Sequence, residues 1–565
     1  MSERSERTIK QSEPSNSLLA AAREWLAEDP DPDTRAELTA LLEVGDRSAL
    51  ADRFGARLQF GTAGLRGALG AGPNRMNRAV VIRAAAGLAS YVRDAGGRAV
   101  VIGFDARHKS DQFARDTAAV VEGAGLRAMV LPEPLPTPVL AFAIRYLGAD
   151  AGVMVTASHN PPQDNGYKVY LGDGSQIVPP ADGEISARID AVGRLADVPL
   201  GTDWITLDEE VVDAYVRRTA AVAAPDTPRD LRVVYTPLHG TGRDVLVAVL
   251  GRAGFAAPDV VPEQAEPDPE FPTVAFPNPE EPGAMDLALA RAVASDADLV
   301  IANDPDADRC AVAVPDPASG GWRMLRGDDV GALIGAHLVR SGRAPVGSGV
   351  FATTIVSSTL LGRIAAEHGL GYTETLTGFK WLSRVPQLRY GYEEALGYCV
   401  DPDTVRDKDG ISAALLVCEL AASLRAAGAG LLGLLDELAA EYGVHATDQL
   451  SIRVDDVAEI DAMMTRLRAN PPAVLGGRAV ESVEDLTTGS LDLPPTDGLR
   501  YRLVGGAWVV VRPSGTEPKL KCYAEVVVPV TGSDVTAARK QAASELAKLR
   551  ADLAAATGAP SPAPS

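Results

Sequence analysis

The stretch that decides the fold is Ala151-Gly-Val-Met-Val-Thr156-Ala-Ser158-His159-Asn160-Pro-Pro162. Its first five residues are small or apolar and predict a short buried strand. The polar residues that follow end in two prolines, which cannot continue a strand ladder, so a loop is expected there. Ser158 therefore follows a strand end, beside a histidine. A serine attacks when a neighbouring group takes its proton, but a Ser-His pair is also common in ordinary turns.

Predicted strands alternate with predicted helices on both sides of this stretch. Such alternation builds βαβ units and a largely parallel sheet, in which loops leaving the carboxyl ends of strands gather ligands. We expect Ser158 on such a loop, and Lys168 on another. Before Ser158, the expected elements are a helix over 78–94, a strand over 99–103, a helix over 112–123, a strand over 127–131 and a helix over 139–147.

Length and charge limit the classes of function. A chain of 565 residues exceeds what one hydrophobic core supports, so several domains are expected. The 54 basic and 76 acidic residues give a net charge of -22, which argues against nucleic acid or an anionic membrane as partner. The four cysteines show no CxxC spacing, so neither a zinc site nor a disulfide framework is indicated. Without a signal peptide or an 18-residue apolar run, we predict a cytoplasmic protein.

The pattern predicts six parts along the chain. Residues 1 to about 16 are expected to be disordered, with two helices over 20–28 and 33–42 following them. The strand, polar loop and helix order restarts twice after the Ser158 segment. The parts are a disordered start and helical extension (1–49), an α/β domain with the Ser158 loop (50–205), an α/β domain with an acidic loop (206–325), an α/β domain with a third polar loop (326–442), a smaller α+β domain (443–557) and a disordered tail (558–565).

The acidic loop is Asp304-Pro-Asp306-Ala-Asp308, which follows an apolar strand. In an extended segment alternate side chains share a face, so these three carboxylates can converge on one hard cation. Mg²⁺ prefers oxygen ligands and keeps positions open for a phosphate oxygen. An acidic surface turn is the other interpretation, but the apolar strand before it and Arg309 after it favour a metal site.

Two loops carry an arginine among small residues. Arg512-Pro-Ser514-Gly515-Thr516 offers a guanidinium, two hydroxyls and a glycine amide, the donors that a phosphate monoester needs. The glycine-rich turn of residues 60–67 carries Arg66. Each is also compatible with an ordinary turn and a solvated arginine. Likewise, Glu393-Glu394 could accept hydrogen bonds from sugar hydroxyls or form a solvated face, and Lys380 and Lys408 could be solvated lysines.

Taken together, these motifs occur in the order found in the α-D-phosphohexomutases. From about Arg57 to Lys548 the chain resembles the phosphoglucomutase and phosphomannomutase superfamily, and its extension and residues 378–381 resemble the longer, phosphopentomutase-like subgroup. The resemblance implies three α/β domains and a smaller α+β domain around a central cleft. It implies that Ser158 is carried as phosphoserine, and that Asp304, Asp306 and Asp308 hold Mg²⁺ together with a phosphate oxygen on Ser158.

The resemblance also implies roles for the remaining loops. Lys168 and Lys408 stand at positions of candidate proton-transfer groups, while Arg66, His159 and Arg309 belong to the same catalytic site. The substrate would be bound by Lys380, Glu393, Glu394, Arg512, Ser514, Gly515 and Thr516.

We therefore expect a phosphosugar mutase that interconverts hexose 1-phosphate and hexose 6-phosphate of glucose, mannose or both. The reaction would pass through a phosphoserine enzyme and a bisphosphate intermediate, with Mg²⁺ as cofactor and sugar 1,6-bisphosphate as activator. Phosphoryl transfer depends on positioning and charge stabilisation, which Mg²⁺, Arg and Lys supply. The partner is a small phosphosugar, with no nucleic acid or membrane, and the oligomeric state is left open.

One departure from the family pattern keeps alternatives open. Ala395 stands where many relatives have Ser beside the sugar-contacting Glu, so a phosphopentomutase is the alternative in substrate class. A sugar 1,6-bisphosphate synthase or phosphatase would refill or hydrolyse the phosphoserine instead of recycling it. A non-catalytic phosphosugar-binding protein is disfavoured because Ser158 and the three aspartates are all present.

Overall fold

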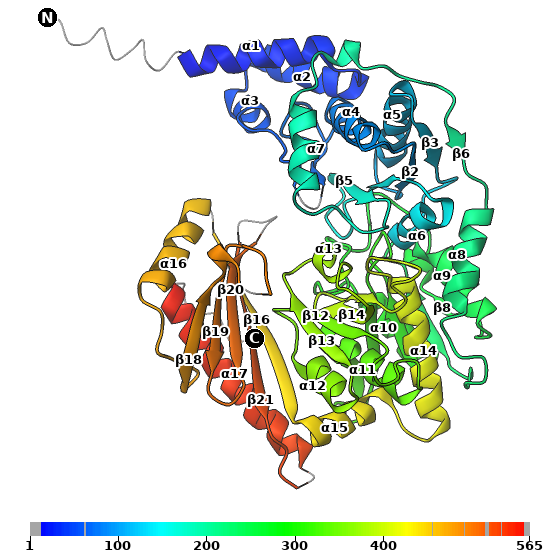
Figure 1. The fold of residues 1–565 in the computed structure, drawn as a ribbon, viewed down its shortest axis with the longest axis vertical. Coiled ribbons are helices and arrows are strands. Elements are labelled where there is room, and N and C mark those ends of the chain that lie inside the picture. The colour runs from blue at the N-terminus through cyan, green and yellow to red at the C-terminus, as the bar shows by residue number, and fades with distance from the viewer. Residues whose placement is uncertain are drawn as a thin grey trace, which may run out of the picture. The chain divides into compact units, whose positions relative to one another are not determined.

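A computed structural model describes residues 13–61, 64–454, 456–490, 492–514, 519–532 and 534–558. The chain forms two compact units. The first unit runs to Ala313 and also contains Asp401–Cys418, and the second unit contains Val314–Val400 and the chain from Glu419 onward. Figure 1 shows the helices and strands of both units.

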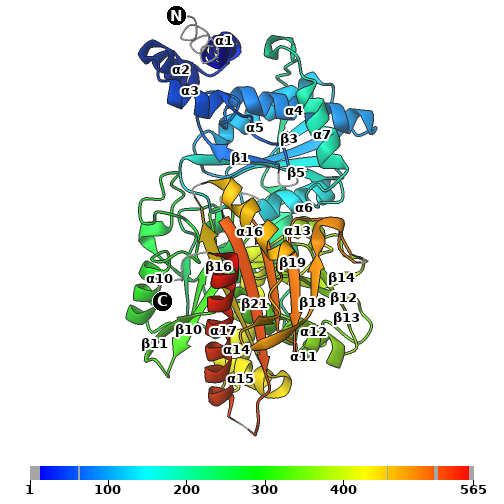
Figure 2. The same cartoon turned by 90° about the vertical axis from the view of Figure 1, so that its left-hand side faces the viewer.

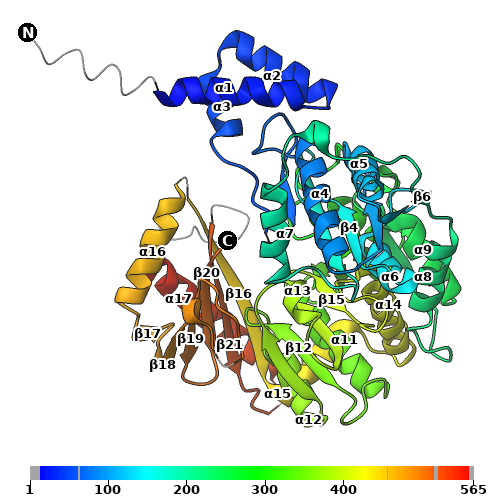
Figure 3. The same ribbon diagram turned by 45° about the horizontal axis from the view of Figure 1, so that its top comes forward.

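The first unit begins with three helices, one more than the sequence predicts. They are α1 (Glu13–Glu28), α2 (Pro32–Val44) and α3 (Arg47–Phe54), drawn in blue in Figure 3. Asp31 caps α2 by accepting a hydrogen bond from the Asp33 amide, and Pro32 occupies the first turn, where its missing N–H costs nothing. The disorder expected up to residue 16 is wrong for residues 13–16, because α1 starts at Glu13; residues 1–12 and 559–565 lie outside the described chain.

The first sheet has the strand order β1-β5-β4-β2-β3-β6. Four of its strands, β6, β3, β2 and β4, run parallel, while β5 pairs antiparallel with β4 and with β1. In Figures 1 and 2, α4 and α5 lie on one side of this sheet and α6 lies on the other. The bounds are β1 (Leu65–Ala68), β2 (Ala99–Phe104), β3 (Arg127–Val130), β4 (Ala151–Val155), β5 (Asp164–Leu171), β6 (Ile205–Thr206), α4 (Arg78–Asp94), α5 (Ser110–Gly123), α6 (Thr137–Leu147) and α7 (Ala181–Asp190).

The second sheet repeats the parallel arrangement. β7 lies between β8 and β9 and is parallel to both, and β10 pairs antiparallel with β9. The chain passes into the second unit within β10. The bounds are α8 (Glu210–Ala220), β7 (Val233–Thr236), α9 (Gly242–Arg252), β8 (Asp259–Val260), α10 (Asp286–Ala294), β9 (Leu299–Ala302), β10 (Ala311–Asp316) and β11 (Gly321–Met324).

The segment Asp401–Cys418 belongs to the first unit although its sequence neighbours belong to the second. The Tyr170 hydroxyl donates to the Asp407 carboxylate over 2.7 Å, and the Tyr215 hydroxyl donates to Asp409 over 2.9 Å. These buried hydrogen bonds anchor the segment to β5 and α8. They bring Lys408, which lies between the two aspartates, into the first unit.

In the second unit the third sheet has the order β13-β12-β14-β15. β12 is parallel to β13 and β14, and β15 returns antiparallel to β14. The bounds are α11 (Gly327–Arg340), β12 (Val350–Thr354), α12 (Leu360–Glu367), β13 (Gly371–Thr375), α13 (Phe379–Leu382), β14 (Leu388–Glu393), β15 (Gly397–Cys399) and α15 (Leu431–Tyr442). The helix α14 (Gly410–Ala426) passes from the first unit into the second after Cys418.

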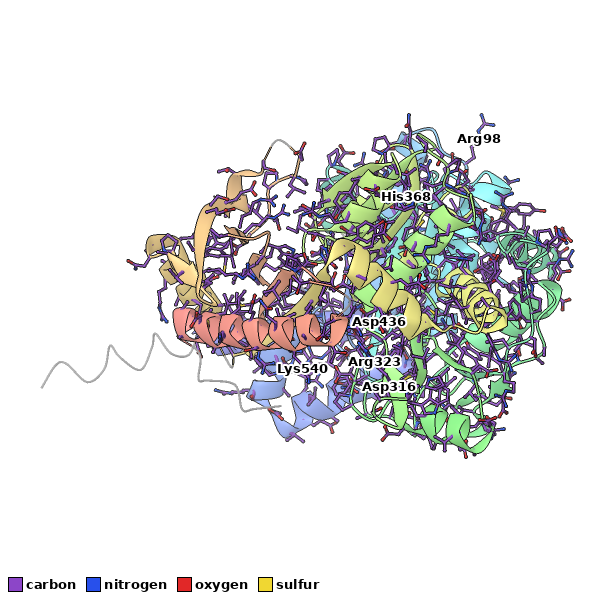
Figure 4. The ribbon with its side chains drawn as sticks, turned by 90° about the horizontal axis from the view of Figure 1, so that it is seen from below. Arg98, Asp316, Arg323, His368, Asp436 and Lys540 are labelled. Atoms are coloured by element: carbon purple, nitrogen blue, oxygen red, sulfur yellow. The ribbon has the colours of Figure 1, made fainter. Side chains whose placement is uncertain are left out.

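The fourth sheet is antiparallel in the order β16-β21-β20-β19-β18-β17. α17 packs against β16 and β21 (Figure 2), and Arg539 on α17 forms an ion pair with Asp436 on α15, which is labelled in Figure 4. With three α/β sheets and this C-terminal α+β part, the predicted fold class is confirmed. The bounds are β16 (Val444–Arg453), α16 (Val457–Ala469), β17 (Val474–Leu475), β18 (Arg478–Asp485), β19 (Leu499–Leu503), β20 (Trp508–Pro513), β21 (Lys519–Val528) and α17 (Val535–Thr557).

Two buried carboxylates join the third and fourth sheets inside the second unit. Glu525 on β21 is fully buried and accepts hydrogen bonds from Ser358 Oγ and Thr359 Oγ1, both over 2.6 Å, and from Trp508 Nε1 over 2.8 Å. Asp328 accepts from Thr447 Oγ1 on β16 over 2.8 Å and from the Ser358 amide over 2.7 Å. A buried carboxylate is tolerated only when hydrogen bonds replace its water shell, so these contacts define the joint between the two sheets.

In the part of the chain that the structure describes, none of the helices could cross a membrane alone by length and apolar composition. One pair, α14 and α15, passes that test together but is bent by 89°.

The pH dependence of stability tests whether Asp328 is buried and protonated between the third and fourth sheets. Asp328 also accepts hydrogen bonds from Tyr392 and Thr447, but burial, together with the charges of Glu394 and Glu525, raises its pKa from 3.8 to about 7. The folded state then holds a proton that the unfolded chain has lost, so the free energy of unfolding falls as pH rises through this range. We expect the melting temperature of wild type to fall, relative to Asp328→Asn, between pH 4 and pH 7.

The exposed Asp461 on α16 supplies the control, and Asp461→Asn should follow the wild-type profile. Parallel profiles for wild type and Asp328→Asn would show that Asp328 is ionised in the folded protein throughout.

Candidate functional site

Ser158 lies in the turn that follows β4 and is 3% exposed. Its φ angle is 53°, in the left-handed region that residues other than glycine rarely adopt. Its amide donates to Thr156 Oγ1 over 2.9 Å, which closes the turn. Its hydroxyl donates to Asp304 Oδ2 over 2.8 Å and lies 3.2 Å from His159 Nδ1. The turn therefore aims the hydroxyl at the acidic loop.

The acidic loop is a turn, and the expectation of an extended segment is wrong. Ala307 has a φ angle of 50°, and its amide donates to the Asp304 carbonyl over 2.8 Å. The carboxylates nevertheless converge, because the turn brings ligand oxygens of Asp304, Asp306 and Asp308 within 4.8 Å of one another. All three side chains are fully buried.

Oxygen atoms in this cluster are suited to a metal ion. Among the described residues, Asp306 Oδ1 and Asp308 Oδ1 are buried without a hydrogen-bond partner. Unpaired carboxylate oxygens in a dry interior are costly, and a hard divalent cation with oxygen ligands removes that cost. The three aspartates thus fit a metal ion by geometry and by chemistry.

Two lysines compensate the negative charge in the same cluster. Lys168 Nζ donates to Asp306 Oδ2 over 2.7 Å and to Asp308 Oδ2 over 2.8 Å. Lys408 Nζ lies 3.3 Å from Asp308 Oδ2. The prediction that Lys168 lies on a loop is wrong, because it belongs to β5, whose pairing with β4 holds it opposite Met154. A strand therefore fixes the lysine beside the metal candidates.

Arg309 closes the acidic turn from its C-terminal side. Its amide donates to Asp304 Oδ1 over 3.0 Å, and its Nε lies 3.8 Å from Asp304 Oδ2. The Asn303 side chain donates to the Arg309 carbonyl over 2.5 Å. Arg309 thereby holds Asp304 in the position that receives the Ser158 hydrogen bond.

The charges of the cluster shift its titration. Burial raises the pKa of Asp304 well above its usual value, and the neighbouring Asp306 and Asp308 add to the effect. Burial acts in the same direction on Asp306, but the charge and hydrogen bond of Lys168 lower its pKa below the usual value. Burial and the charge of Asp306 raise the pKa of Asp308, but the charges of Lys168, Lys408 and Arg309 together lower it. Burial and the cations of Arg309 and Arg66 lower the pKa of His159 well below its usual value, so this imidazole is neutral.

Arg66 lies on a strand, whereas the sequence predicts a glycine-rich turn. β1 pairs with β5 and places Arg66 opposite Gly166. Its guanidinium is half-buried and donates to Asn160 Oδ1 over 3.3 Å, next to the Ser158 turn. Gly64 has a φ angle of 79°, and a Cβ there would meet the Tyr167 carbonyl oxygen at 1.8 Å, so the chain needs glycine at this point.

The predicted substrate residues lie in the second unit. Glu393 ends β14. The carboxylate of Glu394 accepts hydrogen bonds from Thr354 Oγ1 over 3.2 Å and Ser357 Oγ over 3.0 Å. Glu394 thus ties its loop to the end of β12, a contact within the protein that sequence reasoning did not anticipate.

Arg512, Glu393 and Glu394 all act on the phenol of Tyr523. Burial raises the pKa of this phenol, the charges of Glu394 and Glu393 raise it further, and a hydrogen bond with Arg512 lowers it. Elsewhere in this unit, Lys380 Nζ lies 5.9 Å from the centre of the Trp381 ring, and the Ser514 amide donates to the Lys519 carbonyl over 2.8 Å. Gly515 and Thr516 lie outside the described residues.

Thr137 and Arg107 were missed in the sequence. Thr137 Oγ1 donates to Asp306 Oδ2 over 2.6 Å, and its amide donates to the Asp306 carbonyl over 2.9 Å. Arg107 donates hydrogen bonds to the carbonyls of Ser158 and Asn160. Both residues follow parallel strands, β3 and β2, at the same sheet edge as Ser158. Their position directly after predicted parallel strands is the sequence feature that could have identified them as site residues.

Family models match the chain in four consecutive segments. The segments are described as phosphoglucomutase/phosphomannomutase alpha/beta/alpha domain I over residues 57–195, domain II over 213–320, domain III over 326–442 and the C-terminal domain over 451–550. Together they cover most of the chain in the order of the four sheets. The domain boundaries predicted above remain a prediction.

Curated proteins and solved structures show the same similarity. A probable phosphomannomutase of Haemophilus influenzae is 49% identical over 455 residues, covering 79% of this chain and 92% of that protein. A mouse phosphopentomutase is 36% identical over 576 residues, covering 92% of both chains. The crystal structure of a putative phosphomannomutase from Thermus thermophilus superposes with a TM-score of 0.67 at 28% identity, covering 87% of this chain and 99% of that one.

The acidic cluster predicts metal binding that depends on each carboxylate. Replacing a residue that only orients a metal ligand usually costs about 10–100-fold in affinity, so Asp308→Asn should raise the Kd for Mg²⁺ at least about tenfold. Isothermal titration calorimetry of the two proteins would measure this.

Asp226→Asn, at an exposed position of the first unit, is the matched control and should bind Mg²⁺ as wild type does. Equal affinity of wild type and Asp308→Asn would place the metal outside this cluster.

Proposed function

The chain belongs to the phosphoglucomutase/phosphomannomutase family, and from this premise we propose that it moves a phosphate between O1 and O6 of a hexose by way of Ser158. The predicted family, fold class and enzyme type, an isomerase that transfers phosphate within a sugar phosphate, are confirmed. The observation that carries the proposal is the hydrogen bond from the Ser158 hydroxyl to Asp304 within the buried triad.

The reaction needs a phosphate held by the protein, because a phosphate on one end of a sugar cannot reach the other end unaided. In the first half, the bond between Ser158 Oγ and phosphorus breaks as a sugar hydroxyl oxygen bonds to phosphorus and loses its proton. The product is a sugar bisphosphate. After the sugar turns around, Ser158 Oγ takes the other phosphate, and a proton returns to the sugar oxygen that it leaves.

The residues of the first unit have distinct parts in this transfer. Lys168 stays protonated, because Asp306 and Asp308 raise its pKa above the usual value despite burial, so it stabilises negative charge by donating hydrogen bonds. Arg309 and Arg66 add positive charge beside Ser158. A cation bound by the three aspartates supplies further neutralisation of a phosphate on Ser158. Lys408 is the second lysine within reach of the triad and our candidate for proton transfer.

We infer that Mg²⁺ is the physiological cation and that a sugar 1,6-bisphosphate primes Ser158. The oxygen-only donor set of the triad favours Mg²⁺ over softer metals. The partner is a small phosphosugar, with no nucleic acid or membrane involved. We also infer a cytoplasmic location, which is supported by four buried cysteines that all remain free thiols.

We infer that the substrate is a hexose and not a pentose. Glu393 would bind its hydroxyls, and the loop that starts at Arg512 would bind the phosphate that does not react. The identity of 49% to the protein described as a probable phosphomannomutase, against 36% to the mouse phosphopentomutase, supports this choice. A pentose phosphate mutase is the second candidate, because Ala395 offers no hydroxyl beside Glu393.

Ser158→Ala should abolish turnover of glucose 1-phosphate, because no other residue in the scheme carries the phosphate between the two half-reactions. Intact-protein mass spectrometry of wild type mixed with glucose 1,6-bisphosphate should show one added phosphate, which Ser158→Ala lacks. Ser175→Ala is the control: Ser175 is equally buried, its hydroxyl has no hydrogen-bond partner among the described residues, and this variant should stay active. Full activity of Ser158→Ala would refute the proposal.

Initial rates with glucose 1-phosphate, mannose 1-phosphate and ribose 1-phosphate test the substrate, each with Mg²⁺ and a trace of bisphosphate. We expect kcat/KM to favour a hexose, and Ala395→Ser to raise that preference by restoring one hydrogen bond, worth about 1 kcal/mol or roughly fivefold. A preference for ribose would move the substrate to the pentose class. Accumulating bisphosphate or released inorganic phosphate would indicate a synthase or a phosphatase.

A further inference from the structure

A buried arginine binds the backbone of the Ser158 turn. Arg107 follows β2 and is 4% exposed. Its Nη2 donates to the carbonyls of Ser158 and Asn160 over 2.7 and 2.5 Å. Its Nη1 donates to the carbonyls of Pro161 and Asp164 over 2.8 and 3.2 Å. One guanidinium thus serves four backbone carbonyls, three within the turn after Ser158 and the fourth at Asp164, the first residue of β5.

The arginine is itself held on two sides. Asp105 forms an ion pair with Arg107 Nε over 3.3 Å and accepts a hydrogen bond from Ser110 Oγ over 2.6 Å. The ring of Phe271 lies under the guanidinium, with its centre 4.9 Å from Cζ. Phe271 is buried, and its φ angle of 46° shows that the surrounding structure imposes its position. Arg107 is therefore fixed by its own loop and by a segment within the second matched domain, residues 213–320.

We propose that Arg107 is a positioning residue for phosphoryl transfer, which keeps the Ser158 backbone in its left-handed conformation and so aims Oγ at the acidic cluster, with Phe271 holding the guanidinium in place. Arg107 touches the carbonyls of the turn and not the hydroxyl. This inference rests on the proposed role of Ser158 as phosphate carrier. It adds Arg107 and Phe271, which the sequence did not predict, to the residues on which phosphoryl transfer depends.

The geometry explains why arginine is needed at this position. A strained conformation persists only when neighbouring contacts over-determine it. A planar guanidinium presents five donors in a fixed fork, whereas the ammonium of lysine is a point donor on a flexible stem. Lysine at position 107 would keep the charge beside Asp105 but could not bind all four carbonyls, so the turn would gain freedom while the ion pair survives.

Arg229 is a matched control elsewhere in the first unit. Its guanidinium also donates to backbone carbonyls, those of Ala253 over 2.7 Å and Ala224 over 2.5 Å, and lies 4.9 Å from the centre of the Phe255 ring. It contacts no part of the Ser158 turn. Arg229→Lys therefore removes the same kind of contacts without reaching the site.

The test compares Arg107→Lys with Arg229→Lys in the full-length protein with Mg²⁺. Misplacement by about 1 Å costs about 100-fold in rate, so we expect the single-turnover rate of Ser158 phosphorylation by glucose 1,6-bisphosphate to fall at least about tenfold in Arg107→Lys. The KM for glucose 1-phosphate should stay within about twofold, since Arg107 touches no substrate group, and Arg229→Lys should keep both constants within about twofold. Melting temperatures of both variants report general loss of stability.

A second pair of variants isolates the ring contact. Phe271→Leu keeps an apolar side chain but loses the aromatic face, worth about 0.5–2 kcal/mol to a cation, and Phe255→Leu makes the same change under Arg229. We expect Phe271→Leu to lower the phosphorylation rate less than Arg107→Lys does, and Phe255→Leu to leave it unchanged.

The outcomes separate this inference from the proposed function. If wild type takes no phosphate on Ser158, the proposed function fails first. If wild type is phosphorylated on Ser158 and Arg107→Lys reacts at the wild-type rate, the positioning role is overturned. It is also overturned if Arg107→Lys and Arg229→Lys lose rate equally, because the loss would then follow general stability.

Discussion

Three carboxylates in one buried turn impose the constraint on which the first unit depends. Asp304, Asp306 and Asp308 repel one another in a region from which water is excluded, and repulsion between charges grows as the local dielectric falls. The fold offsets this with donors from several separate segments: Lys168 on β5, Lys408 on the returning segment and Thr137 at the start of α6. Two carboxylate oxygens still lack a donor among the described residues, which leaves room for a cation.

The same constraint accounts for the backbone around the triad. Ser158 and Ala307 both adopt positive φ angles, and each lies in a turn whose amides and carbonyls are bonded within the turn or to a neighbouring side chain. The Gly240 backbone approaches Pro305 so closely that a Cβ would meet its Cα at 2.3 Å, which packs the acidic turn from behind. Strain of this kind is retained where the position of a reacting group matters more than local stability.

The second unit handles buried charge in a different way. Glu525 accepts hydrogen bonds from Ser358, Thr359 and Trp508 and lies 3.3 Å from His445 Nδ1. Although burial raises its pKa, His445 and the hydroxyl donors lower it below the usual value, so Glu525 can remain charged while it joins the third and fourth sheets. Glu394 is likewise occupied by Thr354 and Ser357, which leaves Glu393 as the member of the pair at the strand end. Adjacent carboxylates thus have separate roles, one holding the loop and the other proposed to bind substrate.

The sequence by itself determined the order of strands, polar loops and helices, because hydrophobic period and turn residues are local properties that the chain carries without tertiary contacts. It also predicts which loops hold the chemistry, since Ser158, the three aspartates and Arg512 stand in recognisable motifs. Only the tertiary structure decided that Lys168 and Arg66 lie on strands and that the acidic segment is a turn. Only the tertiary structure brings Thr137, Arg107 and Phe271, which are far apart in sequence, next to the acidic turn or the Ser158 turn and its arginine. Their roles come from distances across the fold, which no local pattern encodes.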